Sequence, residues 1–445
     1  MRWPVRFPDL PAWLDWQQAL HPHAIEPGLE RLQRVLLRTR WSPPEVPVIT
    51  VGGTNGKGSC VALLEAVLRA SGRRVGTFTS PHLIEYRERI RVDDMEVSAT
   101  TLIVVFERIA DALGDDTLTF FEFNALAALL VFATARPDCI VLEVGMGGRL
   151  DAVNVVDADV TIIASLGLDH LEWLGPDLES IAREKAGILR PNRPAVFGGG
   201  AGEAALASEA RVIGAHLLRR GQEFDARAAS PGRWRFADDH WQLDALPAPA
   251  LDGPHQIDNA ACVLAALSQL QDRLPITRAD IERGLQCAFA PGRFQRVRAL
   301  DREWIFDVAH NADAAGVLAR NLDRTRSRGR TLAVCGMLAD KDVAAVLREM
   351  RSVVDTWFAA STAGERGLES AALAQRGAEI GIAMDDAGPV HVAMATARRE
   401  AAERDRIVVF GSFHTVGPAI GWLREQTGHH DRWLRAETSD SKSYT

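Results

Sequence analysis

A glycine-rich stretch with one lysine, GGTNGKGS at residues 52–59, has the residue types of a phosphate-binding loop. Glycines let backbone N–H groups converge on an anion, and a lysine at this position reaches the β- and γ-phosphates of a nucleotide. The usual pattern places a hydroxyl residue directly after the lysine, but here Gly58 follows Lys57 and the hydroxyl comes at Ser59. A magnesium ion at this loop therefore requires an oxygen ligand from Ser59 or from another segment.

The segments on either side of this loop are typical of a nucleotide-binding sheet. VPVITV at residues 46–51 predicts a buried strand, and SCVALLEAVLRA, closed by Gly72, predicts an amphipathic helix. RRVGTFTS, CIVLEV and ADVTIIAS are further strand candidates, separated by helical stretches. This alternation predicts a mostly parallel sheet with helices on both faces. It also disfavours the alternative of a glycine turn without a ligand.

Polar residues follow several of these strands and are candidates for binding a metal ion. Ser80 ends TFTS and Glu143 ends IVLE. The carboxyl ends of parallel strands meet at one edge of a sheet, where a carboxylate beside a phosphate-binding loop is well placed for Mg²⁺. His170 also ends a strand region, but Mg²⁺ prefers oxygen and a lone histidine is more often structural. Lys185, taken alone, is a helix-surface lysine whose default partner is a neighbouring acid.

A second alternation of strands and helices follows CAFAPGRFQRV at residues 287–297. Its strand candidates are EWIFDV, TLAVCGML, VVDTWFAA and RIVVFGS. They predict a smaller, open, Rossmann-like α/β domain over residues 298–428, after a larger domain over residues 1–297. Residues 201–251 favour short strands or an insertion, and the polar residues 429–445 favour a frayed tail.

The composition of the 445 residues restricts the classes of partner. A net charge of −8 argues against a protein that coats nucleic acid or an anionic membrane. No apolar run reaches the roughly 18 residues of a membrane span, and the N-terminal residues lack the apolar stretch of a signal peptide. Cysteines 60, 139, 262, 287 and 335 show no paired spacing, which favours reduced thiols and a cytoplasmic protein.

Eight motifs carry a resemblance to a known family. GTNGKGS, SPHL with YRERIR, LEVGMGGRLDAVN, LDHLEWLG, REKAGI, PGRFQ, DVAHN and GSFHTV occur in that order. Together they resemble the folylpolyglutamate synthase/dihydrofolate synthase family, a branch of the Mur ligase superfamily, from about Leu20 to Gly417. A glycine after the lysine is this family's own form of the loop. The resemblance implies a P-loop ATPase domain with a mostly parallel sheet, followed by a smaller Rossmann-like α/β domain.

The resemblance also implies a nucleotide and metal site. ATP is expected at Thr54, Asn55, Gly56, Lys57, Gly58, Ser59, Asn259, Arg293 and Asp307. Two Mg²⁺ ions are expected at Ser80, Glu143, His170, Lys185 and Ser59, with a monovalent cation as a further ligand. Family members carry a carbamate on the equivalent of Lys185, which requires a neutral amine, and burial or nearby positive charge would lower its pKa. Lys57, Lys185, Arg293 and His170 are the expected catalytic residues, although an interdomain salt bridge is the alternative for Arg293.

Two further sets of residues match substrate positions of the family. The pterin set is Ile25, Glu26, Pro27, Thr119, Phe120, Phe121, Glu122, Leu150, Asp151 and Ala152, and the glutamate set is His310 and Ser412. Phe120 and Phe121 could stack on a pterin or benzoate ring. For two aromatic residues at this spacing, packing at the start of a buried helix is the more common role.

The activity that the resemblance implies is an ATP-dependent amide ligase acting in the cytoplasm as a monomer. It would add L-glutamate to dihydropteroate and to folates through an acyl phosphate, with neither nucleic acid nor membrane as a partner. Domain closure around PGRF would exclude water from this intermediate. One alternative is a folylpolyglutamate synthase without the first activity. Another is a P-loop small-molecule kinase, which would not need DVAHN and GSFH. A non-catalytic nucleotide-binding regulator is disfavoured because the candidate residues are intact.

Overall fold

The chain folds into two compact units in a computed structural model that describes residues 6–325, 329–364 and 366–429. Unit 1 extends to Ala250 and includes Pro254–Phe289. Unit 2 comprises Leu251–Gly253 and the chain from Ala290 onward. Residues 430–445 of the predicted tail lie outside the described residues.

Unit 1 is built on an eight-stranded sheet in the order β4-β3-β2-β5-β1-β6-β7-β8. Its parallel strands are β1 (Val48–Gly52), β2 (Val75–Phe78), β5 (Cys139–Glu143), β6 (Val160–Ile163), β7 (Pro194–Phe197) and β8 (His216–Arg219). The short strands β3 (Ile90–Val92) and β4 (Met95–Glu96) add an antiparallel edge. The predicted mostly parallel sheet is therefore confirmed, and the carboxyl ends of β1, β2 and β5 lie side by side.

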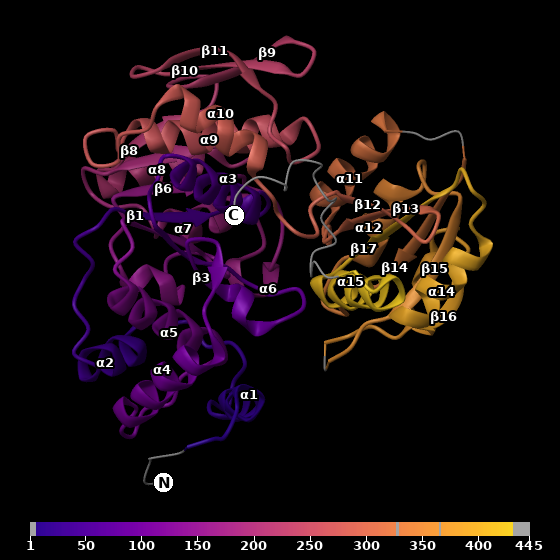
Figure 1. Ribbon diagram of the computed structural model, residues 1–445, viewed down its shortest axis with the longest axis horizontal. Coiled ribbons are helices and arrows are strands. Elements are labelled where there is room, and N and C mark those ends of the chain that lie inside the picture. The colour runs from indigo at the N-terminus through magenta and orange to yellow at the C-terminus, as the bar shows by residue number, and fades with distance from the viewer. Residues whose placement is uncertain (1–5, 326–328, 365, 430–445) are drawn as a thin grey trace. The chain divides into compact units, whose positions relative to one another are not determined.

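Helices cover both faces of this sheet (Figure 1). One face carries α3 (Lys57–Ala70), α9 (His255–Ser268) and α10 (Arg278–Cys287). The other carries α5 (Phe120–Ala135), with α1 (Leu10–Ala19), α2 (Glu30–Arg38) and α4 (Ala99–Ala112) packed around it. The remaining helices of unit 1 are α6 (Leu171–Leu174), α7 (Leu178–Ala186) and α8 (Glu203–Ile213), with 3-10 turns η1 (Tyr86–Arg89) and η2 (Ala152–Val155).

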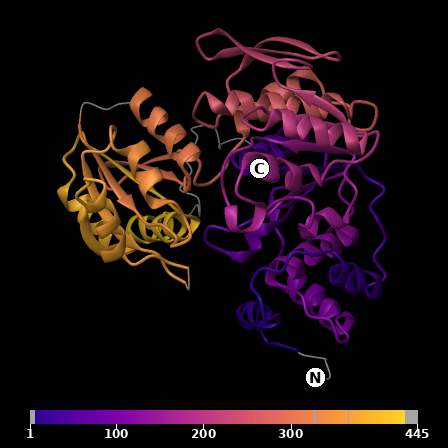
Figure 2. The same ribbon diagram turned by 180° about the vertical axis from the view of Figure 1, so that it is seen from behind.

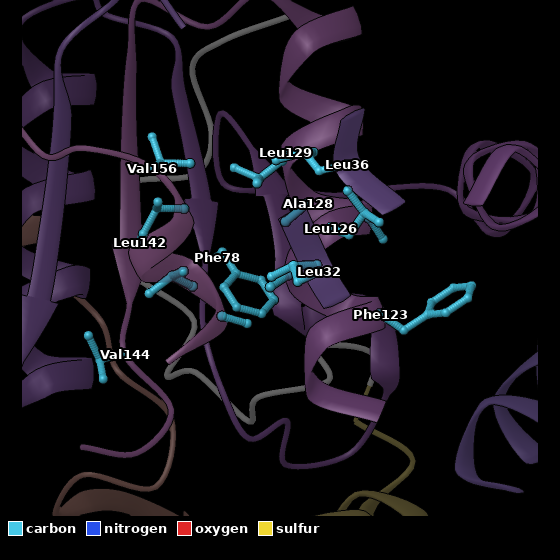
Figure 3. Close-up of a cluster of buried hydrophobic side chains, with 14 of the residues drawn as sticks. Leu32, Leu36, Phe78, Phe123, Leu126, Ala128, Leu129, Leu142, Val144 and Val156 are labelled. Atoms are coloured by element: carbon cyan, nitrogen blue, oxygen red, sulfur yellow. The ribbon is translucent and has the colours of Figure 1, made fainter. Parts of the chain in front are cut away.

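The core on the second face forms around α5. This helix is apolar on almost every side, and a helix of that kind is stable only when it is surrounded by protein. Figure 3 shows its residues Phe123, Leu126 and Leu129 together with Leu32 of α2 and Phe78 of β2. This packed core thus supports the strands whose carboxyl ends carry the polar candidates.

Residues 225–247 form a separate three-stranded antiparallel sheet of β9 (Asp225–Ser230), β10 (Arg233–Ala237) and β11 (Gln242–Pro247). It lies over α9 and α10, as both ribbon views show (Figures 1 and 2). Trp234 and Phe236 alternate along β10 and are buried, and the Trp234 indole donates to the carbonyl of Pro247 at 2.9 Å. Alternation over such short segments is a weak signal, so the sequence indicates strands here without their pairing.

Unit 2 contains a six-stranded sheet in the order β12-β13-β17-β14-β15-β16. The strands are β12 (Gln295–Ala299), β13 (Arg302–Asp307), β14 (Thr331–Cys335), β15 (Thr356–Ser361), β16 (Asp385–Pro389) and β17 (Arg406–Phe410). The pairs are parallel except for β12 with β13. The helices are α11 (Ala312–Arg324), α12 (Val343–Met350), α13 (Ser370–Glu379), α14 (Val390–Glu400) and α15 (Phe413–Thr427). This order confirms the predicted open α/β class.

Two findings bear on the composition arguments. In the described parts of the chain, no helix combines the length and apolarity needed to cross a membrane. The cysteines are unpaired thiols, four of them buried and Cys287 exposed.

Candidate active site

The phosphate-binding loop connects β1 to α3 as the sequence predicts. Gly53 and Gly56 have φ angles of +139° and +87°, a backbone region that residues with a side chain rarely adopt. A Cβ atom on Gly56 would lie 2.7 Å from the side-chain oxygen of Asn259. Glycine is therefore required at position 56 both by the backbone conformation and by the approach of α9.

Hydrogen bonds from the segment after β6 fix this loop. The Thr54 N–H donates to the carbonyl of Ser165 at 2.9 Å, and the Thr54 hydroxyl donates to the carbonyl of Gly167 at 3.0 Å. The Asn55 N–H donates to the Ser165 hydroxyl at 3.0 Å. Because the segment after β6 supplies these bonds, the protein itself organises the loop.

Lys57 places its ammonium group at the loop. Its Nζ donates to the carbonyl oxygens of Gly53 at 2.9 Å and Thr54 at 3.3 Å. The same charge acts on two buried groups: it opposes the burial that raises the pKa of Asp151, and it adds to the burial that lowers the pKa of Lys185. Lys57, Asp151 and Lys185 therefore converge on one edge of the sheet.

Lys185 lies in the last turn of α7 and is 4% exposed, so the default expectation of a surface lysine is wrong. Burial, aided by the charge of Lys57, lowers the pKa of its amine to about 7, against the opposing effect of Asp169 and Asp151. A substantial fraction of this amine is neutral near pH 7. The physical condition for forming a carbamate is thus met.

Asp151 is bound by the backbone on both sides of its carboxylate. One oxygen accepts the N–H groups of Gly145 and Met146 at 2.9 and 3.0 Å, and the other accepts that of Val153 at 3.0 Å. Burial raises its pKa to about 6. These hydrogen bonds hold the GMGGRLD loop close to the carboxyl end of β5. Asp151 therefore has a structural role in addition to the contact with a pterin that is predicted for it.

Glu143 and Ser80 meet at the carboxyl ends of β5 and β2. Glu143 is 3% exposed, and one of its oxygens accepts the N–H of Ser80 at 3.2 Å. The parallel register sets Glu143 opposite Val51 of β1, one residue before the end of the strand that leads into the phosphate-binding loop. The sheet therefore brings the candidate carboxylate and the backbone of Ser80 together beside that loop.

Ser59 contacts α9 through Gln256. The Gln256 side chain donates to the Ser59 hydroxyl at 3.3 Å and accepts from Asn259 at 2.9 Å. All three residues are buried. The chain Ser59–Gln256–Asn259 joins the start of α3 to α9.

His170 follows the loop after β6 and begins α6 with a φ of +53°. Its N–H donates to the Asp169 carboxylate at 2.9 Å, and its ring Nε2 lies 3.9 Å from the other Asp169 oxygen. No three His, Cys, Asp or Glu side chains within residues 6–325, 329–364 and 366–429 form a metal-binding group. The predicted metal ligands therefore depend on serine hydroxyls and a carbamate as well as on Glu143.

The segments predicted to bind the pterin are joined by a polar network. Thr119 and Glu122 cap the start of α5 reciprocally, and Arg31 donates to the Glu122 carboxylate at 2.9 Å. Arg31 also pairs with Glu26, which contacts His21 at 2.8 Å. Glu26 and Glu122, 96 positions apart in the sequence, are therefore held by one guanidinium group. Ile25 is half-buried, and Pro27 is exposed.

Phe120 and Phe121 are half-buried and pack against the core, in line with the commoner expectation for them. The Arg89 guanidinium lies 5.4 Å from the centre of the Phe120 ring. The Phe121 ring lies 5.9 Å from that of Phe78, and a Cβ atom on Gly145 would lie 2.6 Å from it. Leu150 is half-buried and Ala152 is buried at the start of η2.

The unit 2 candidates gather at the carboxyl ends of β13 and β17, where the register pairs Asp307 with Phe410. The half-buried Asp307 carboxylate accepts the N–H groups of Phe294 and Ala309, each at 2.8 Å. Burial raises its pKa, against the opposing charge of Arg293.

Three other unit 2 candidates lie on the loops that follow these strands and on PGRF. The Arg293 guanidinium lies 5.4 Å from the centre of the Phe413 ring. The His310 Nδ1 is 2.8 Å from the carbonyl of Val308, and the Ser412 hydroxyl accepts the N–H of His414 at 3.1 Å. Unit 2 thus presents a cation, an imidazole and a hydroxyl together.

Comparisons with known proteins identify the family. Residues 51–197 match the Mur ligase middle domain, and residues 292–413 match the Mur ligase glutamate ligase domain. The chain is 43% identical over 416 residues to the dihydrofolate synthase/folylpolyglutamate synthase of Escherichia coli K12, covering 93% of this chain and 96% of that protein. The chain belongs to the dihydrofolate synthase/folylpolyglutamate synthase family of Mur ligases.

Other members of this family agree in sequence and structure. The Haemophilus influenzae protein of the same name is 35% identical over 428 residues, covering 92% of this chain and 96% of that protein. The structure of E. coli FolC in complex with DHPP and ADP has a TM-score of 0.88 and 41% identity, covering 94% and 98% of the two chains. The Yersinia pestis enzyme complexed with AMPPNP and Mn ion has a TM-score of 0.87 and 40% identity, covering 95% and 100%.

Membership in the dihydrofolate synthase/folylpolyglutamate synthase family confirms the predicted resemblance and the ligase class. The small-molecule kinase alternative is accordingly set aside, because residues 292–413 form a glutamate ligase domain.

The sequence alone did not identify three side chains that hold the candidates in place. Gln256 has a detectable signal, because HQIDN sets it three positions before Asn259 on one helix face. Asp169 directly precedes the candidate His170. Arg31 has no local signal, because its partner Glu122 is 91 positions away in the sequence.

Proposed function

We propose that this family member joins L-glutamate to dihydropteroate and to folates in two steps, with the residues named above in the following roles. The γ-phosphate of ATP is first transferred to a substrate carboxylate, which gives an acyl phosphate and ADP. The glutamate amine then attacks the acyl carbon, and inorganic phosphate leaves. The observation that supports these roles best is that the charge of Lys57 acts on the buried Lys185, while Glu143 ends β5 next to the strand that leads into the loop of Lys57.

The nucleotide part rests on the loop 53–59 and the start of α3. Backbone N–H groups of the loop and the helix dipole attract the phosphates, and Lys57 adds a full positive charge. Thr54, Asn55, Gly56, Gly58, Ser59 and Asn259 line or support this loop in the proposal. Complexes of relatives with ADP or AMPPNP support a nucleotide here.

The residues at the strand ends fit a hard divalent metal ion, because their donors are oxygens. Ser80, Glu143 and Ser59 supply hydroxyl and carboxylate groups, and a carbamate on Lys185 would supply two more oxygens. His170 is the proposed nitrogen ligand at the second of two sites. A divalent ion at this edge would neutralise charge on the phosphates. A monovalent cation stays a prediction.

Lys185 acquires its oxygens by carbamate formation. The lone pair of the neutral amine attacks carbon dioxide, a C–N bond forms, and one proton leaves the nitrogen. As the C–N bond forms, one C=O π bond of carbon dioxide breaks and its electrons move to oxygen, so a neutral amine becomes an anion. The pKa of about 7 supports it, because the ammonium form has no lone pair to donate.

Unit 2 supplies the amino-acid side in this proposal. Arg293 stabilises the charge that develops on the transferred phosphoryl group, and Asp307 holds the PGRF segment through the Phe294 N–H. His310 and Ser412 bind the glutamate substrate, whose carboxylates suit an imidazole and a hydroxyl. A relative with Mn, AMPPNP and L-glutamate bound supports a glutamate site.

The pterin side belongs to unit 1. Ile25, Glu26 and Pro27 face this substrate with Thr119 to Glu122 and Leu150 to Ala152, and Arg31 sets the distance between the first two segments. A relative in complex with DHPP and ADP supports a pterin-type ligand. We further propose that the enzyme acts as a cytoplasmic monomer, which sedimentation at working concentration would test.

The decisive experiment measures ATP turnover with dihydropteroate and L-glutamate, together with the mass of the product. We expect a product heavier by one glutamyl residue and one ADP per amide bond. Tetrahydrofolate in place of dihydropteroate tests the second activity, and competition between the two tests a shared site. ADP release without glutamate dependence would contradict the ligase mechanism.

A further inference from the structure

A buried ion pair joins α3 to the edge of the unit 1 sheet. Arg91 of β3 donates to the Glu65 carboxylate of α3 at 2.7 Å, with side chains 18% and 6% exposed. Burying two charges is costly, so such a pair adds little net stability. A role in fixing one arrangement of the segments that it joins is a better explanation.

Both partners of this pair have second contacts at the end of β2. The other Glu65 oxygen accepts the hydroxyl of Thr77 at 3.0 Å. Arg91 also donates to the Thr79 hydroxyl at 3.2 Å and to the Glu88 carbonyl at 2.9 Å. Thr77 and Thr79 are two positions apart, so both point to the same face of this extended segment. The pair therefore holds the last part of β2 at two points.

The segment held in this way leads directly to the proposed metal ligands. Thr79 precedes Ser80, whose N–H donates to Glu143 at 3.2 Å. The charge of Glu143 also acts on Arg91. At the other end, Glu65 lies eight residues after Lys57 on the same helix, which is about 12 Å along its axis.

We propose that Glu65 and Arg91 are positioning residues that set Ser80 and Glu143 relative to the phosphate-binding loop. Because α3 is rigid, Glu65 keeps a fixed position relative to the loop. The ion pair with Arg91 then fixes Thr79 and Ser80 relative to the same loop. The arrangement fixes the distance between the nucleotide phosphates and the metal ligands before either ligand binds. The inference rests on the proposed function, because it assigns a purpose to that metal site.

Two variants and one matched control test this inference. Arg91→Met removes the ion pair. Thr79→Val leaves the ion pair intact and removes only the hydroxyl, which accepts from Arg91 at 3.2 Å and donates to the Glu88 carbonyl at 3.3 Å. The control is Arg69→Met: Arg69 is also on α3 and also contacts the β3–β4 hairpin, through Asp93 at 3.2 Å and Asp94 at 3.0 Å. Those two contacts lie at the end of the hairpin remote from Ser80.

The measurement is Mn²⁺ binding in the presence of ADP, by electron paramagnetic resonance, with ADP binding alone and thermal unfolding measured beside it. We expect Mn²⁺ to bind about fivefold more weakly to Thr79→Val, which loses the two hydrogen bonds of one hydroxyl group. For Arg91→Met we expect a loss of about 10- to 100-fold, typical of a residue that supports metal ligands. Arg69→Met should bind Mn²⁺ as the unsubstituted protein does, and ADP affinity without metal should be unchanged throughout.

The outcomes distinguish this inference from the proposed function. If the unsubstituted protein binds no Mn²⁺ with ADP, the proposed metal site fails and this inference fails with it. If it binds Mn²⁺ and Thr79→Val binds equally well, the positioning role is wrong while the proposed function stands. Equal losses in Arg69→Met and the two variants would also overturn the inference, because they would indicate a general effect on the hairpin.

Discussion

Each unit ends a strand of its sheet in a carboxylate, yet the two carboxylates have different surroundings, since Glu143 is buried and Asp307 is half-buried. Asp307 at the end of β13 accepts two backbone N–H groups at 2.8 Å, from Phe294 and Ala309. Glu143 at the end of β5 accepts the N–H of Ser80 at a longer 3.2 Å and lies in the field of two buried arginines. The same topological position therefore holds a loop in unit 2, whereas in unit 1 we propose that it presents a carboxylate to a metal ion.

The cations of the chain show a second difference. Only four of the 51 Lys and Arg residues in the sequence are lysines, at positions 57, 185, 341 and 442. Two of these four lie at the unit 1 sheet edge, where the charge of Lys57 acts on Lys185, whereas arginine supplies the cation in ion pairs such as Arg91–Glu65 of unit 1 and Arg330–Asp405 of unit 2. Lysine can lose its proton when buried and arginine cannot, so the chemistry expected at Lys185 requires lysine. Unit 1 thus holds the two lysines of the candidate site.

The largest effect is expected at Lys57. Lys57→Met removes the cation at the phosphate-binding loop, and we expect turnover of ATP to fall by about 10²- to 10³-fold. The matched control is Lys341→Met, a lysine of unit 2, which should change turnover less than twofold. Nearly full ATP turnover in Lys57→Met would contradict the assignment of the nucleotide site to unit 1.

The next prediction sets the two carboxylates against each other. Glu143→Gln should lower turnover by about 10- to 100-fold through weaker metal binding, with little change in the urea midpoint. Asp307→Asn places an NH₂ group against one of two backbone donors, and should lower the free energy of unfolding by about 1–3 kcal/mol. Turnover and urea unfolding are measured for both variants. Similar losses of both properties in the two variants would show that the carboxylates have the same role.

The burial of Lys185 should lower the free energy of unfolding, although the proposed function requires it. Its pKa is about 7 in the folded chain and 10.5 ordinarily, so the unfolded chain binds a proton that the folded chain does not. Stability is therefore lost as the pH falls from 10.5 toward 7 and the loss is constant below that range. Lys185→Met avoids this cost and should unfold with a free energy higher by on the order of a few kcal/mol near pH 7.

The Lys185 measurement compares urea unfolding at pH 7 and pH 9.5 in buffer free of carbon dioxide, with Lys341→Met as the control. The advantage of Lys185→Met should shrink at the higher pH, while its turnover is reduced at both. Equal stability of the two proteins at pH 7 would mean that the buried amine carries no such cost. A ¹³C-labelled carbamate signal that disappears in Lys185→Met would show the modification directly.

The sequence predicted the strand ends well because local patterns determine them. Alternating apolar segments and the glycines of the loop were sufficient to place Lys57, Ser80 and Glu143 at one edge. Burial of Lys185 was not predictable from its helix, because the residues that cover it come from distant segments. Partners such as Gln256 with Ser59 were missed for the same reason, since 197 positions separate them.

The smallest effect is expected at Glu26, which is distant in sequence from the charged residues at the strand ends. This carboxylate is largely exposed but pairs with Arg31 and His21, and the His21 contact is the main cause of its lowered pKa. Exposed pairs are weak, so Glu26→Gln should raise the KM for dihydropteroate only about two- to fivefold and leave the KM for ATP unchanged. Glu30→Gln on α2 is the matched control. Steady-state kinetics with each substrate varied in turn would detect the difference, and an equal rise in both KM values would indicate that unit 1 does not separate pterin positioning from phosphate chemistry.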